Sequence, residues 1–513
     1  MKIVTAGEMK NLESKSFELY GIDGALMMEH AAISLYLAIE EEIGNLSGKK
    51  ILVIAGKGNN GGDAFSAART FIEAGANVKV YLALGEPTGE LPRKNLSILI
   101  KLGMECKNYS KENSKEFVDD LKWSDLVLDG ILGTGTNGTI SDELGNLIDL
   151  VNENSKFTVS IDLPTGLNAD GEASSNRCIM ADMTVTFGFI KRGMLFYPGR
   201  TACGKIKIGK IGIPQKLIDS QFFEGELTTF DDAKMLLPTR PKLSNKGTFG
   251  KVLIISGSSQ YTGTPVMVSL GALRVGAGLV FATVPAPFNT VITSSLPEAI
   301  SIPLDEEKGF ISTKSIETID EFAEKASVIA IGPGLGDHDE SVEVIKHVLS
   351  KFNDKPMIID ADGLTLISKD IEGIKFNDRM IITPHPGEFS RLTSINAGMI
   401  LSNPVKYARE FARSKNVNVL LKGPTTVIAM PDERYTLNIT GNTGLAKGGT
   451  GDVLTGMIAG FAAQGMDVFH AAQLSAYIHG RTSELYSKNK NEASMLPRDL
   501  VELIPQILYE LSQ

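Results

Sequence analysis

Short, uninterrupted apolar runs recur along the chain, and many of them end in a glycine-rich loop. In the clearest example, the run 51–55 (ILVIA) is followed directly by residues 56–63 (GKGNNGGD). Runs of this length without alternating polar residues are typical of strands buried on both faces of a parallel sheet. Helical patterns separate the runs, so the repeating unit is a strand, a loop and a helix. The sequence therefore predicts an α/β fold.

The runs fall into two series, which indicates two domains where a chain of 513 residues allows roughly two to four. The first series comprises candidate strands at 51–55, 78–84, 126–128, 157–161 and 184–187. The second comprises candidate strands at 252–256, 279–284, 328–331, 357–359, 380–383, 419–422, 426–430 and 435–438. Residues 211–241 break the rhythm with prolines, so we place the boundary within 215–230. We expect one doubly wound domain over 1–222 and a larger α/β domain over 223–513.

Composition and charge exclude several classes of function. The formal net charge of −10 argues against an extended nucleic-acid-binding surface, because phosphate backbones attract faces rich in Lys and Arg. The three cysteines are far apart and form no CxxC pair, so neither a zinc cluster nor a disulfide scaffold is expected. No uncharged apolar run reaches the roughly 18 residues that span a bilayer, and the N-terminus lacks a signal-peptide core. We expect a cytoplasmic protein that binds neither nucleic acid nor membranes.

Residues 56–63 form the first glycine-rich loop between a predicted strand and a predicted helix. Its glycines would let the backbone approach a phosphate at the helix N-terminus, although the loop could also be a tight turn without a ligand. The GxGxxG spacing is met, but the acidic residue of a dinucleotide-binding motif is represented only by the nearby Glu86. Asn59, Asn60 and Asp63 add polar groups that a plain turn does not need, which favours a binding site.

Two more polar loops follow strands of the first series, at 129–136 (DGILGTGT) and 162–167 (DLPTGL). The carboxyl ends of parallel strands meet at one edge of the sheet, so these loops should lie beside the first glycine-rich loop. The oxygens of Asp129, Asp162 and Thr165 suit a hard cation. Each aspartate could instead cap a helix, but three oxygen-rich loops at one edge favour a ligand site.

A second glycine-rich segment, residues 444–452 (GLAKGGTGD), precedes the predicted helix 453–463. Consecutive backbone N–H groups from Gly448 to Gly451 can form an anion hole. Asp452 stands at the helix start, where it could accept a proton from a hydroxyl that attacks a phosphate, or simply cap the helix. The complete GGTGD run favours the catalytic role.

Further loops at strand ends bring candidate ligand-binding groups to the second domain. They are 332–336 (GPGLG), 383–388 (TPHPGE) and 421–426 (LKGPTT). Lys422 can meet phosphate, and we expect His385, held between two prolines, to contact a ligand. Asp360 and Asp362 follow another strand and could bind Mg²⁺ or cap a helix.

Seven motifs resemble, in the right order, those of the bifunctional NAD(P)H-hydrate repair enzymes, in which an NAD(P)HX epimerase is fused to an ADP-dependent NAD(P)HX dehydratase. The epimerase motifs are GNNGGD (58–63), DGILGTG (129–135) and IDLPTGL (161–167). The dehydratase motifs are GPGLG (332–336), TPHPGE (383–388), KGPTT (422–426) and GGTGD (448–452). The resemblance covers nearly the whole chain. Two residues depart from the usual family text: Ala64 stands where glycine is common, and Thr264 where alanine is common.

For the first domain, the resemblance implies a Rossmann-like fold that interconverts (R)- and (S)-NAD(P)HX. Asp162 would be the catalytic residue for proton transfer, and K⁺ would bind to Asn60, Asp129 and Thr165. The implied substrate contacts are Asn59, Asn60, Gly61, Gly62, Asp63, Gly133, Thr134, Gly135, Thr136, Asn137, Gly138, Thr139 and Asp162.

For the second domain, the resemblance implies a ribokinase-like fold that dehydrates (S)-NAD(P)HX to NAD(P)H while ADP is cleaved to AMP and phosphate, with Mg²⁺. Asp452 would activate the C6 hydroxyl of the hydrate for attack on the terminal phosphate of ADP. The hydrate would contact Thr264, Gly334, Gly336, His385 and Asp452. The nucleotide, ADP or AMP, would contact Lys422, Gly423, Pro424, Thr425, Thr426 and Gly451. These small molecules are the implied partners, and we expect a homo-oligomer.

Two alternatives remain open from the residues alone. GGTGD and KGPTT would permit a small-molecule kinase of the ribokinase superfamily with an unrelated N-terminal domain, but that hypothesis leaves the three oxygen-rich loops of the first domain unexplained. A non-catalytic nucleotide sensor would bind the same ligands without turnover. The products separate these hypotheses, because a kinase leaves a stable phosphorylated product, whereas a dehydratase releases phosphate and restores absorbance near that of NAD(P)H.

Overall fold

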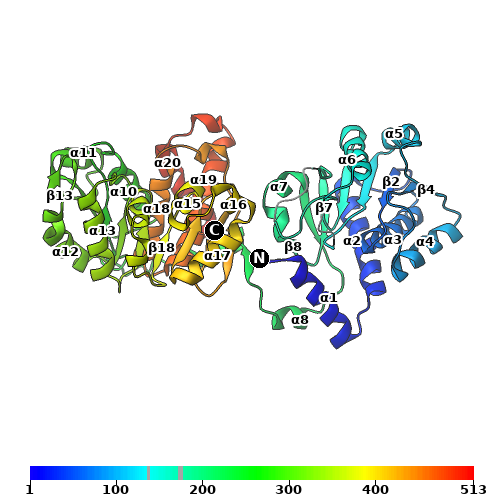
Figure 1. Ribbon diagram of the computed structural model, residues 1–513, viewed down its shortest axis with the longest axis horizontal. Coiled ribbons are helices and arrows are strands. Elements are labelled where there is room, and N and C mark those ends of the chain that lie inside the picture. The colour runs from blue at the N-terminus through cyan, green and yellow to red at the C-terminus, as the bar shows by residue number, and fades with distance from the viewer. Residues whose placement is uncertain (136–138, 172–176) are drawn as a thin grey trace. The chain divides into compact units, whose positions relative to one another are not determined.

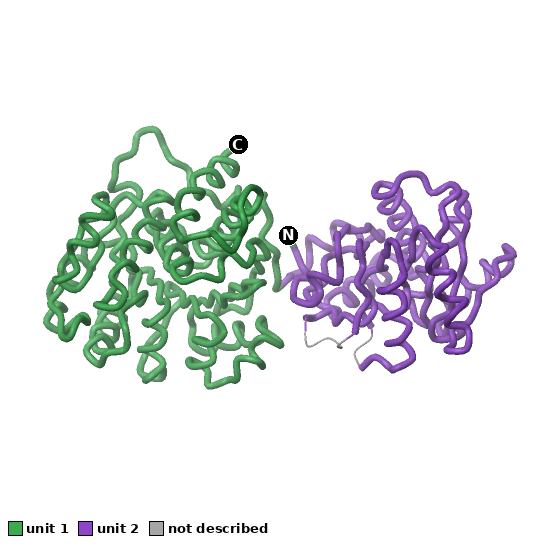
Figure 2. The backbone as a smooth tube through the Cα atoms, turned by 90° about the horizontal axis from the view of Figure 1, so that it is seen from above, with its two compact units in different colours: residues 1, 224–513 green, residues 2–223 purple. Residues whose placement is uncertain are grey.

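The backbone divides into two compact units in a computed structural model of the protein, which describes residues 1–135, 139–171 and 177–513 (Figure 2). One unit comprises residues 2–223, and the other comprises Met1 and residues 224–513. In both units strands alternate with helices along the chain (Figure 1), which confirms the predicted α/β class. Within the described residues, no helix is long and apolar enough to cross a membrane.

The unit of residues 2–223 is built on a parallel sheet with the strand order β4-β3-β2-β5-β6-β7-β9. The strands are β2 (Lys50–Ala55), β3 (Asn77–Leu82), β4 (Cys106–Asn108), β5 (Leu126–Gly130), β6 (Thr158–Ile161), β7 (Met183–Phe187) and β9 (Lys205–Gly209). A short parallel pair, β1 (Lys2–Val4) with β8 (Ile190–Lys191), is not part of this sheet. The order reverses between β2 and β5, and doubly wound folds bind ligands beyond the carboxyl ends of the strands at such a switch point.

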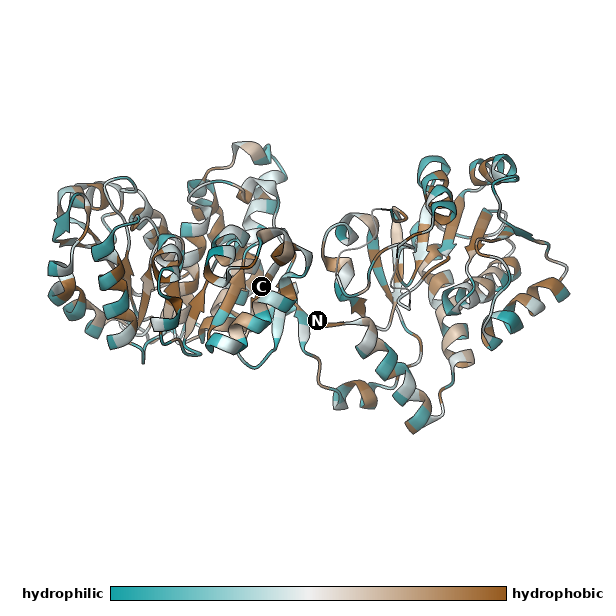
Figure 3. Ribbon diagram, viewed as in Figure 1, coloured by the Kyte–Doolittle hydropathy of each residue, from teal (hydrophilic) through white to brown (hydrophobic). Residues whose placement is uncertain are grey.

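Helices cover both faces of this sheet. Alternate residues of β2 point to opposite sides: Ile51 and Val53 join an apolar cluster with α2 and α3, whereas Leu52 and Ile54 join another with α5 and α6. Burial on both faces explains the continuous apolar runs, and Figure 3 shows the strands as apolar ribbons between helices of mixed character. The helices are α1 (Ala6–Tyr20), α2 (Gly24–Ile43), α3 (Asn59–Glu73), α4 (Glu90–Lys101), α5 (Ser114–Trp123), α6 (Asp142–Asn154), α7 (Gly199–Ala202) and α8 (Gln215–Ser220).

Within the unit of residues 224–513, the strand order is β13-β12-β11-β16-β17-β18-β19-β20-β21-β10. Neighbouring strands are parallel, except that β20 is antiparallel to both β19 and β21. The strands are β10 (Gly225–Leu227), β11 (Lys251–Ile255), β12 (Leu279–Pro285), β13 (Ile300–Leu304), β16 (Val328–Ile331), β17 (Met357–Ile359), β18 (Met380–Ile382), β19 (Asn418–Leu421), β20 (Thr426–Ala429) and β21 (Tyr435–Asn438), with a separate hairpin of β14 (Glu306–Glu307) and β15 (Phe310–Ile311). The helices are α9 (Phe230–Leu236), α10 (Thr264–Arg274), α11 (Asn289–Ser295), α12 (Ile316–Lys325), α13 (Asp339–Lys351), α14 (Asp362–Ser368), α15 (Pro386–Thr393), α16 (Ala397–Ser402), α17 (Pro404–Lys415), α18 (Thr450–Ala463), α19 (Val468–Ser487) and α20 (Pro497–Ser512).

α18 is buried along nearly its whole length and crosses α10 at close range. A Cβ on Gly456 of α18 would lie 1.9 Å from Val268 O, and one on Gly271 of α10 would lie 2.3 Å from Val453 O. Any larger residue at these positions would force the helices apart. The contact therefore fixes the first turns of both helices relative to each other.

The ends of several elements differ from the predictions. α3 begins at Asn59 rather than at residue 64, α18 begins at Thr450 rather than at residue 453, and β3 ends at Leu82 rather than at residue 84. In both helices, glycine-rich segments that look like loops continue into the first helical turn. The strands β4, β9 and β13 were not predicted, because they end their sheets and are only partly buried, so they lack a continuous apolar run.

Candidate active sites

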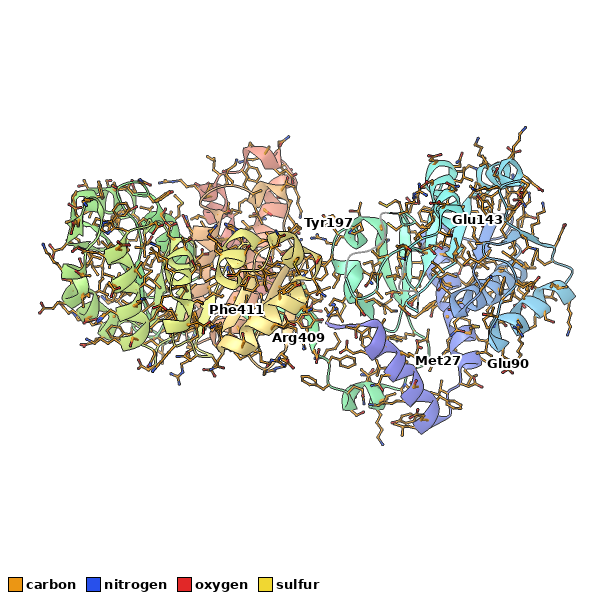
Figure 4. The ribbon with its side chains drawn as sticks, in the orientation of Figure 1. Met27, Glu90, Glu143, Tyr197, Arg409 and Phe411 are labelled. Atoms are coloured by element: carbon orange, nitrogen blue, oxygen red, sulfur yellow. The ribbon has the colours of Figure 1, made fainter. Side chains whose placement is uncertain are left out.

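The first candidate site is a cavity of about 760 Å³ beyond the carboxyl ends of β2, β5 and β6. One wall comes from the start of α3 and the loops that follow these strands. The other wall comes from α1 and α2 and includes Met27 (Figure 4). The predicted residues that line the cavity are Asn59, Asn60, Asp63, Gly133, Thr134, Gly135 and Asp162.

Other predicted substrate contacts take different positions. Gly61 and Gly62 are buried in the first turn of α3, and a Cβ on Gly61 would lie 2.0 Å from Gly56 O. Gly61 thus allows the helix to pack closely on the preceding turn. Thr139 is exposed and is not among the residues that line the cavity. The predicted contacts Thr136, Asn137 and Gly138 lie outside the described residues.

Asp162 faces the cavity in a left-handed backbone conformation, with φ of 61°. Non-glycine residues held in this strained region concentrate at functional sites. Its Oδ1 accepts hydrogen bonds from Phe187 N–H at 3.0 Å and from the ammonium of Lys191. Lys191 is completely buried and also donates to Thr186 Oγ1 at 3.0 Å and to Phe187 O at 2.9 Å. The three donors of this ammonium therefore hold Asp162 and the end of β7 together.

Two further carboxyl groups face the same cavity. Burial raises the pKa of Asp63 well above its usual value; the charges of Asp162 and Glu13 raise it further, whereas Lys191 lowers it. Burial also raises the pKa of Glu13, and the charge of Asp162 acts in the same direction. Both groups thus hold their protons to higher pH than ordinary carboxyls, next to an aspartate that is paired with a lysine.

The three predicted potassium ligands gather around the backbone of Leu132. Asn60 Nδ2 donates to Leu132 O at 3.0 Å, and Leu132 N–H donates to Thr165 Oγ1 at 3.0 Å. Thr165 Oγ1 donates in turn to Asp129 Oδ1 at 2.7 Å. Asp129 is fully buried and also accepts hydrogen bonds from two backbone N–H groups and from the hydroxyl of Ser160. Burial raises the pKa of Asp129, and these hydrogen bonds oppose that effect.

The second candidate site lies at the N-terminus of α18, beyond the ends of β17 and β19. The Lys422 ammonium donates to Asp360 Oδ1 at 2.6 Å, and Thr455 Oγ1 of α18 donates to Asp360 Oδ2 at 2.6 Å. A Cβ on Gly451 would lie 3.4 Å from Lys422 Nζ, so the ammonium rests against the first turn of α18. Asp360 does not cap α14, since the N-cap of that helix is Ala361.

Asp452 stands in the first turn of α18. Burial raises the pKa of its carboxyl to about 7, and the charges of Asp360 and Asp362 add to this effect, whereas Lys422 and a hydrogen bond with Thr264 oppose it. A carboxylate whose pKa lies near neutrality is well matched to proton transfer at physiological pH. The pKa and the position beside Lys422 agree with the predicted role as a base.

The turn before α18 is fixed by hydrogen bonds of Thr450. Its hydroxyl lies 2.8 Å from both Leu445 O and Lys447 O, and its own carbonyl lies 3.0 Å from Nε2 of the buried His479. Burial lowers the pKa of His479 to about 4, so the ring is neutral and donates its proton to this carbonyl. The N–H groups in the first turn of a helix have no partner within the helix, so the turn presents donors to an anion.

Thr264 and Gly334 lie together beside Asp452, and Gly336 contacts the nearby Asp362. Thr264 begins α10, and its side chain hydrogen-bonds with Asp452. A Cβ on Gly334 would lie 3.0 Å from Thr264 Cβ, which brings this loop against the start of α10. Gly336 N–H donates to Asp362 Oδ2 at 2.9 Å. Three of the predicted hydrate contacts therefore surround the candidate base and its acidic neighbour.

His385 caps a helix as well as standing at a strand end. Its Nδ1 accepts hydrogen bonds from Gly387 N–H at 3.0 Å and Glu388 N–H at 3.3 Å, while 54% of the side chain remains exposed. Pro384 O accepts a hydrogen bond from Lys422 N–H at 2.8 Å, so the loop of His385 lies beside the predicted nucleotide loop. The predicted nucleotide contacts Gly423, Pro424 and Thr425 follow Lys422 in the turn between β19 and β20, and Thr426 begins β20.

Several supporting residues carried no motif. Lys191 ends the stretch FGFIK, and a lysine directly after so apolar a segment was the only signal available. Glu13 lies one helical turn after Met9, and both residues line the cavity. A charged residue on the same face of a helix as an apolar residue was therefore a signal that could have identified Glu13. Nothing in the sequence marked His479 or Thr455.

Comparisons with known proteins cover both units of the chain. A family model described as YjeF-related protein N-terminus matches residues 24–193, and one described as NAD(P)H-hydrate dehydratase matches residues 252–506. The curated bifunctional NAD(P)H-hydrate repair enzyme Nnr of Moorella thermoacetica is 36% identical over 518 residues, which cover 100% of this chain and 98% of that protein. The enzyme of the same name from Dictyoglomus turgidum is 33% identical, with 100% and 99% covered. A solved ribokinase-like superfamily protein from Enterococcus faecalis V583 matches with a TM-score of 0.50 and 26% identity, and the match covers 57% of this chain and 98% of that one.

The matches confirm the predicted ribokinase-like fold of the second domain and the predicted order of the two domains. They also exclude an unrelated N-terminal domain, because the curated relatives align with the chain from end to end. With full-length relatives above 30% identity and both family models in order, the chain belongs to the bifunctional NAD(P)H-hydrate repair enzymes.

Proposed function

We propose that residues 1–222 interconvert (R)- and (S)-NAD(P)HX and that residues 223–513 dehydrate the (S) form with ADP as the phosphate donor. One observation carries the dehydratase part of the proposal: Asp452 shares the first turn of α18 with backbone N–H groups, and the Lys422 ammonium rests against Gly451. A base and an anion site therefore lie side by side, as phosphoryl transfer to a hydroxyl requires.

In the dehydratase site, Asp452 removes the proton of the C6 hydroxyl of the (S) hydrate. The hydroxyl oxygen then forms a bond to the terminal phosphorus of ADP, the bond from that phosphorus to its bridging oxygen breaks, and AMP leaves. Phosphorylation converts hydroxide, a poor leaving group, into phosphate. Loss of phosphate from C6 and of a proton from C5 restores the double bond of NAD(P)H.

The remaining predicted residues hold the two reactants. Lys422 and the N–H groups at the start of α18 stabilise the charge on the transferred phosphate. Residues 423–426 contact the nucleotide, because the turn that continues from Lys422 comprises 423–425 and leads into Thr426 at the start of β20. Thr264, Gly334, Gly336 and His385 contact the hydrate. Thr264 and Gly334 lie beside Asp452, and Gly336 hydrogen-bonds with the nearby Asp362. His385 joins them through the loop that hydrogen-bonds with Lys422.

The charge balance of this site fits a magnesium–nucleotide complex. Asp360 and Asp362 both raise the pKa of Asp452, and Lys422 is the one cation among the described groups that shift it. Since Asp360 is engaged by Lys422 and Thr455, Asp362 is the carboxylate that would face the metal. Mg²⁺ is held mainly by phosphate oxygens and water, and it supplies positive charge to the phosphate during transfer.

In the epimerase site, Asp162 transfers the proton that inversion at C6 requires. The cavity of about 760 Å³ has the size of a small-molecule or cofactor site, and Asp162 reaches it on a strained backbone. The hydrate contacts the predicted residues that line this cavity, which are Asn59, Asn60, Asp63, Gly133, Thr134, Gly135 and Asp162. Asp63 and Glu13 line the same cavity as Asp162, and burial raises the pKa of both carboxyl groups.

The cluster around Leu132 fits K⁺. Its oxygens come from an amide, a hydroxyl, a backbone carbonyl and a carboxylate, which are hard ligands. Asp129 is fully buried, and the hydrogen bonds that the described residues give it all come from neutral donors. Because a buried charge without a counter-ion is costly, a monovalent cation held by Asn60, Thr165 and Asp129 would balance it.

The test is to incubate the purified full-length protein with mixed (R)- and (S)-NADHX and either ADP or ATP. We expect both forms to be converted to NADH with release of one phosphate per hydrate. Absorbance monitors the formation of NADH, and a phosphate assay monitors the release of phosphate. A stable phosphorylated product would indicate a kinase, and binding without turnover would indicate a sensor; either result would overturn the proposal. Conversion of the (S) form alone would refute the epimerase half.

A further inference from the structure

We propose that Asp360 is a positioning residue of the dehydratase: it fixes the Lys422 ammonium against the first turn of α18, so that this cation and Asp452 keep a constant separation. The inference rests on the proposed function of this site. It concerns a residue that, as an aspartate directly after β17, could serve either as a metal ligand or as a helix cap. The contacts of Asp360 point to neither role.

Asp360 is held firmly from several directions. Its two carboxylate oxygens accept hydrogen bonds from Lys422 at the end of β19 and from Thr455 within α18, each at 2.6 Å. Its backbone N–H donates to Ile331 O at 3.2 Å, and its carbonyl O lies 2.0 Å from where a Cβ on Gly332 would be. Only 2% of the side chain is exposed. The carboxylate therefore has little room to shift, and the groups bound to it are fixed as well.

These contacts connect the cation to the helix that carries the base. Thr455 follows Asp452 by three residues on α18, so the two side chains leave adjacent positions on one side of the helix. Asp360 thereby joins the end of β19 to the same helical turn. α18 is itself fixed by the close approach of Gly456 to Val268. The separation of Lys422 from Asp452 is thus set by rigid elements rather than by the flexible lysine side chain.

A fixed lysine suits phosphate binding better than a free one. A lysine stem with four carbons samples many rotamers, and a ligand must otherwise order them when it binds. The ammonium has three donors, so two can reach phosphate oxygens while one remains on Asp360. The side chain of Lys422 is 24% exposed, which leaves it accessible to such a ligand.

The first test is Asp360→Asn in the full-length protein. This variant keeps the shape of the side chain and an acceptor for Thr455 but removes the charge that holds Lys422. We expect kcat/KM for ADP to fall about 10²-fold, the cost of a misplaced group near a reacting centre, while binding of adenosine stays unchanged. Equal weakening of ADP and adenosine binding in calorimetric titrations would indicate a merely structural role and would overturn the proposal.

The second test is a double-mutant cycle with Lys422→Met. If Asp360 acts through Lys422, then Asp360→Asn should lower kcat/KM for ADP less than about threefold in the Lys422→Met background. Independent, multiplicative losses would contradict the proposal. Should Asp360→Asn fail to fold, Thr455→Val tests the same connection: it should lower kcat/KM about 3- to 10-fold in the native background and have little effect in Lys422→Met.

A matched control is available on the surface of the same unit. Asp370 pairs with Lys346 at 2.9 Å, and both side chains are substantially exposed. Asp370→Asn should therefore change neither ADP use nor adenosine binding. If the proposed function is wrong, the unsubstituted protein will show no ADP-dependent dehydration. If only this inference is wrong, the unsubstituted protein will be active and the variants will not behave as expected.

Discussion

The two sites contain the same kind of ion pair with opposite members exposed. In the unit of residues 2–223, Asp162 faces the cavity with 15% of its side chain exposed, while its partner Lys191 is wholly buried. In the unit of residues 224–513, Lys422 is 24% exposed, while its partner Asp360 is only 2% exposed. In each pair the more exposed member is the one for which we propose a contact with the ligand, and the buried member is bonded to it.

The exposed member matches the chemistry proposed for its site. Epimerisation needs a group that transfers a proton, and the carboxylate of Asp162 faces the cavity. Binding of a nucleotide phosphate needs a cation, and the ammonium of Lys422 faces the anion-binding turn. The buried partner balances the charge where water cannot. The presence of an aspartate–lysine pair at the end of a strand therefore does not by itself indicate the chemistry of a site. The more exposed member of the pair does, because that member can reach the ligand.

The largest effect should follow from Asp452→Asn. Without its base, ADP-dependent dehydration should fall by about 10³-fold, whereas exchange between (R)- and (S)-NADHX should continue, because Asp162 belongs to the other site. NADH absorbance reports the first activity, and chromatographic separation of the two hydrates reports the second. Loss of both activities in a folded variant would refute the two-site interpretation.

Asp162→Asn should give the reciprocal result with a somewhat smaller loss. We expect (R)/(S) exchange to slow by about 10²- to 10³-fold, because the amide cannot accept the proton, while dehydration of the (S) form continues. The measurement is consumption of pure (R)-NADHX in the presence of ADP. Consumption faster than spontaneous epimerisation would show that Asp162 is not the catalytic group.

Sequence patterns predicted the candidate ligand-facing groups but not the ion pairs that hold them, for a physical reason. Asp162 directly follows an apolar run, where the carboxyl ends of parallel strands bind ligands, and Asp452 ends a glycine-rich run at a helix start, so local sequence is enough to single both out. Lys191 lies 29 residues after Asp162, and Lys422 lies 62 residues after Asp360. Which of many lysines turns toward a given carboxylate is decided by the packing of whole strands and helices, and no local pattern records it.

The same reasoning separates the predictable part of the fold from the rest. Strands such as β2 are buried on both faces and reveal themselves as apolar runs. β9 (KIKIG) ends its sheet, is only partly buried and alternates lysine with isoleucine, so it contains no continuous apolar run. The wall that α1 contributes to the cavity also required the structure, because a helical pattern predicts a helix but not the part of the sheet on which it packs.

The ion-pair comparison predicts a difference in stability between two variants of one pair. Asp162→Asn leaves the ammonium of Lys191 wholly buried without a counter-charge, which should cost about 3 kcal/mol of unfolding free energy. Lys191→Met leaves Asp162 at the cavity surface, where water can reach it, and should cost less. Denaturant unfolding of both full-length variants, followed through the transition of the first unit, measures the difference. Equal or reversed costs would contradict the roles assigned to the exposed and buried members.

The smallest effect concerns the pH dependence of dehydration, which connects Asp360 with catalysis. Asp452 must be ionised to act as a base, and its pKa is raised to about 7. The protonated fraction therefore grows below neutrality, and kcat/KM for dehydration should fall about tenfold per pH unit below about pH 7 and level off above it.

The charge of Asp360 contributes to this raised pKa, so Asp360→Asn should move the acidic limb of the profile toward lower pH. The profile is measured with saturating ADP and pure (S)-NADHX, with Asp370→Asn as the control whose limb should not move. A limb displaced toward higher pH in Asp360→Asn would mean that loss of the Lys422 position outweighs loss of the negative charge, and the electrostatic role of Asp360 would then have to be abandoned.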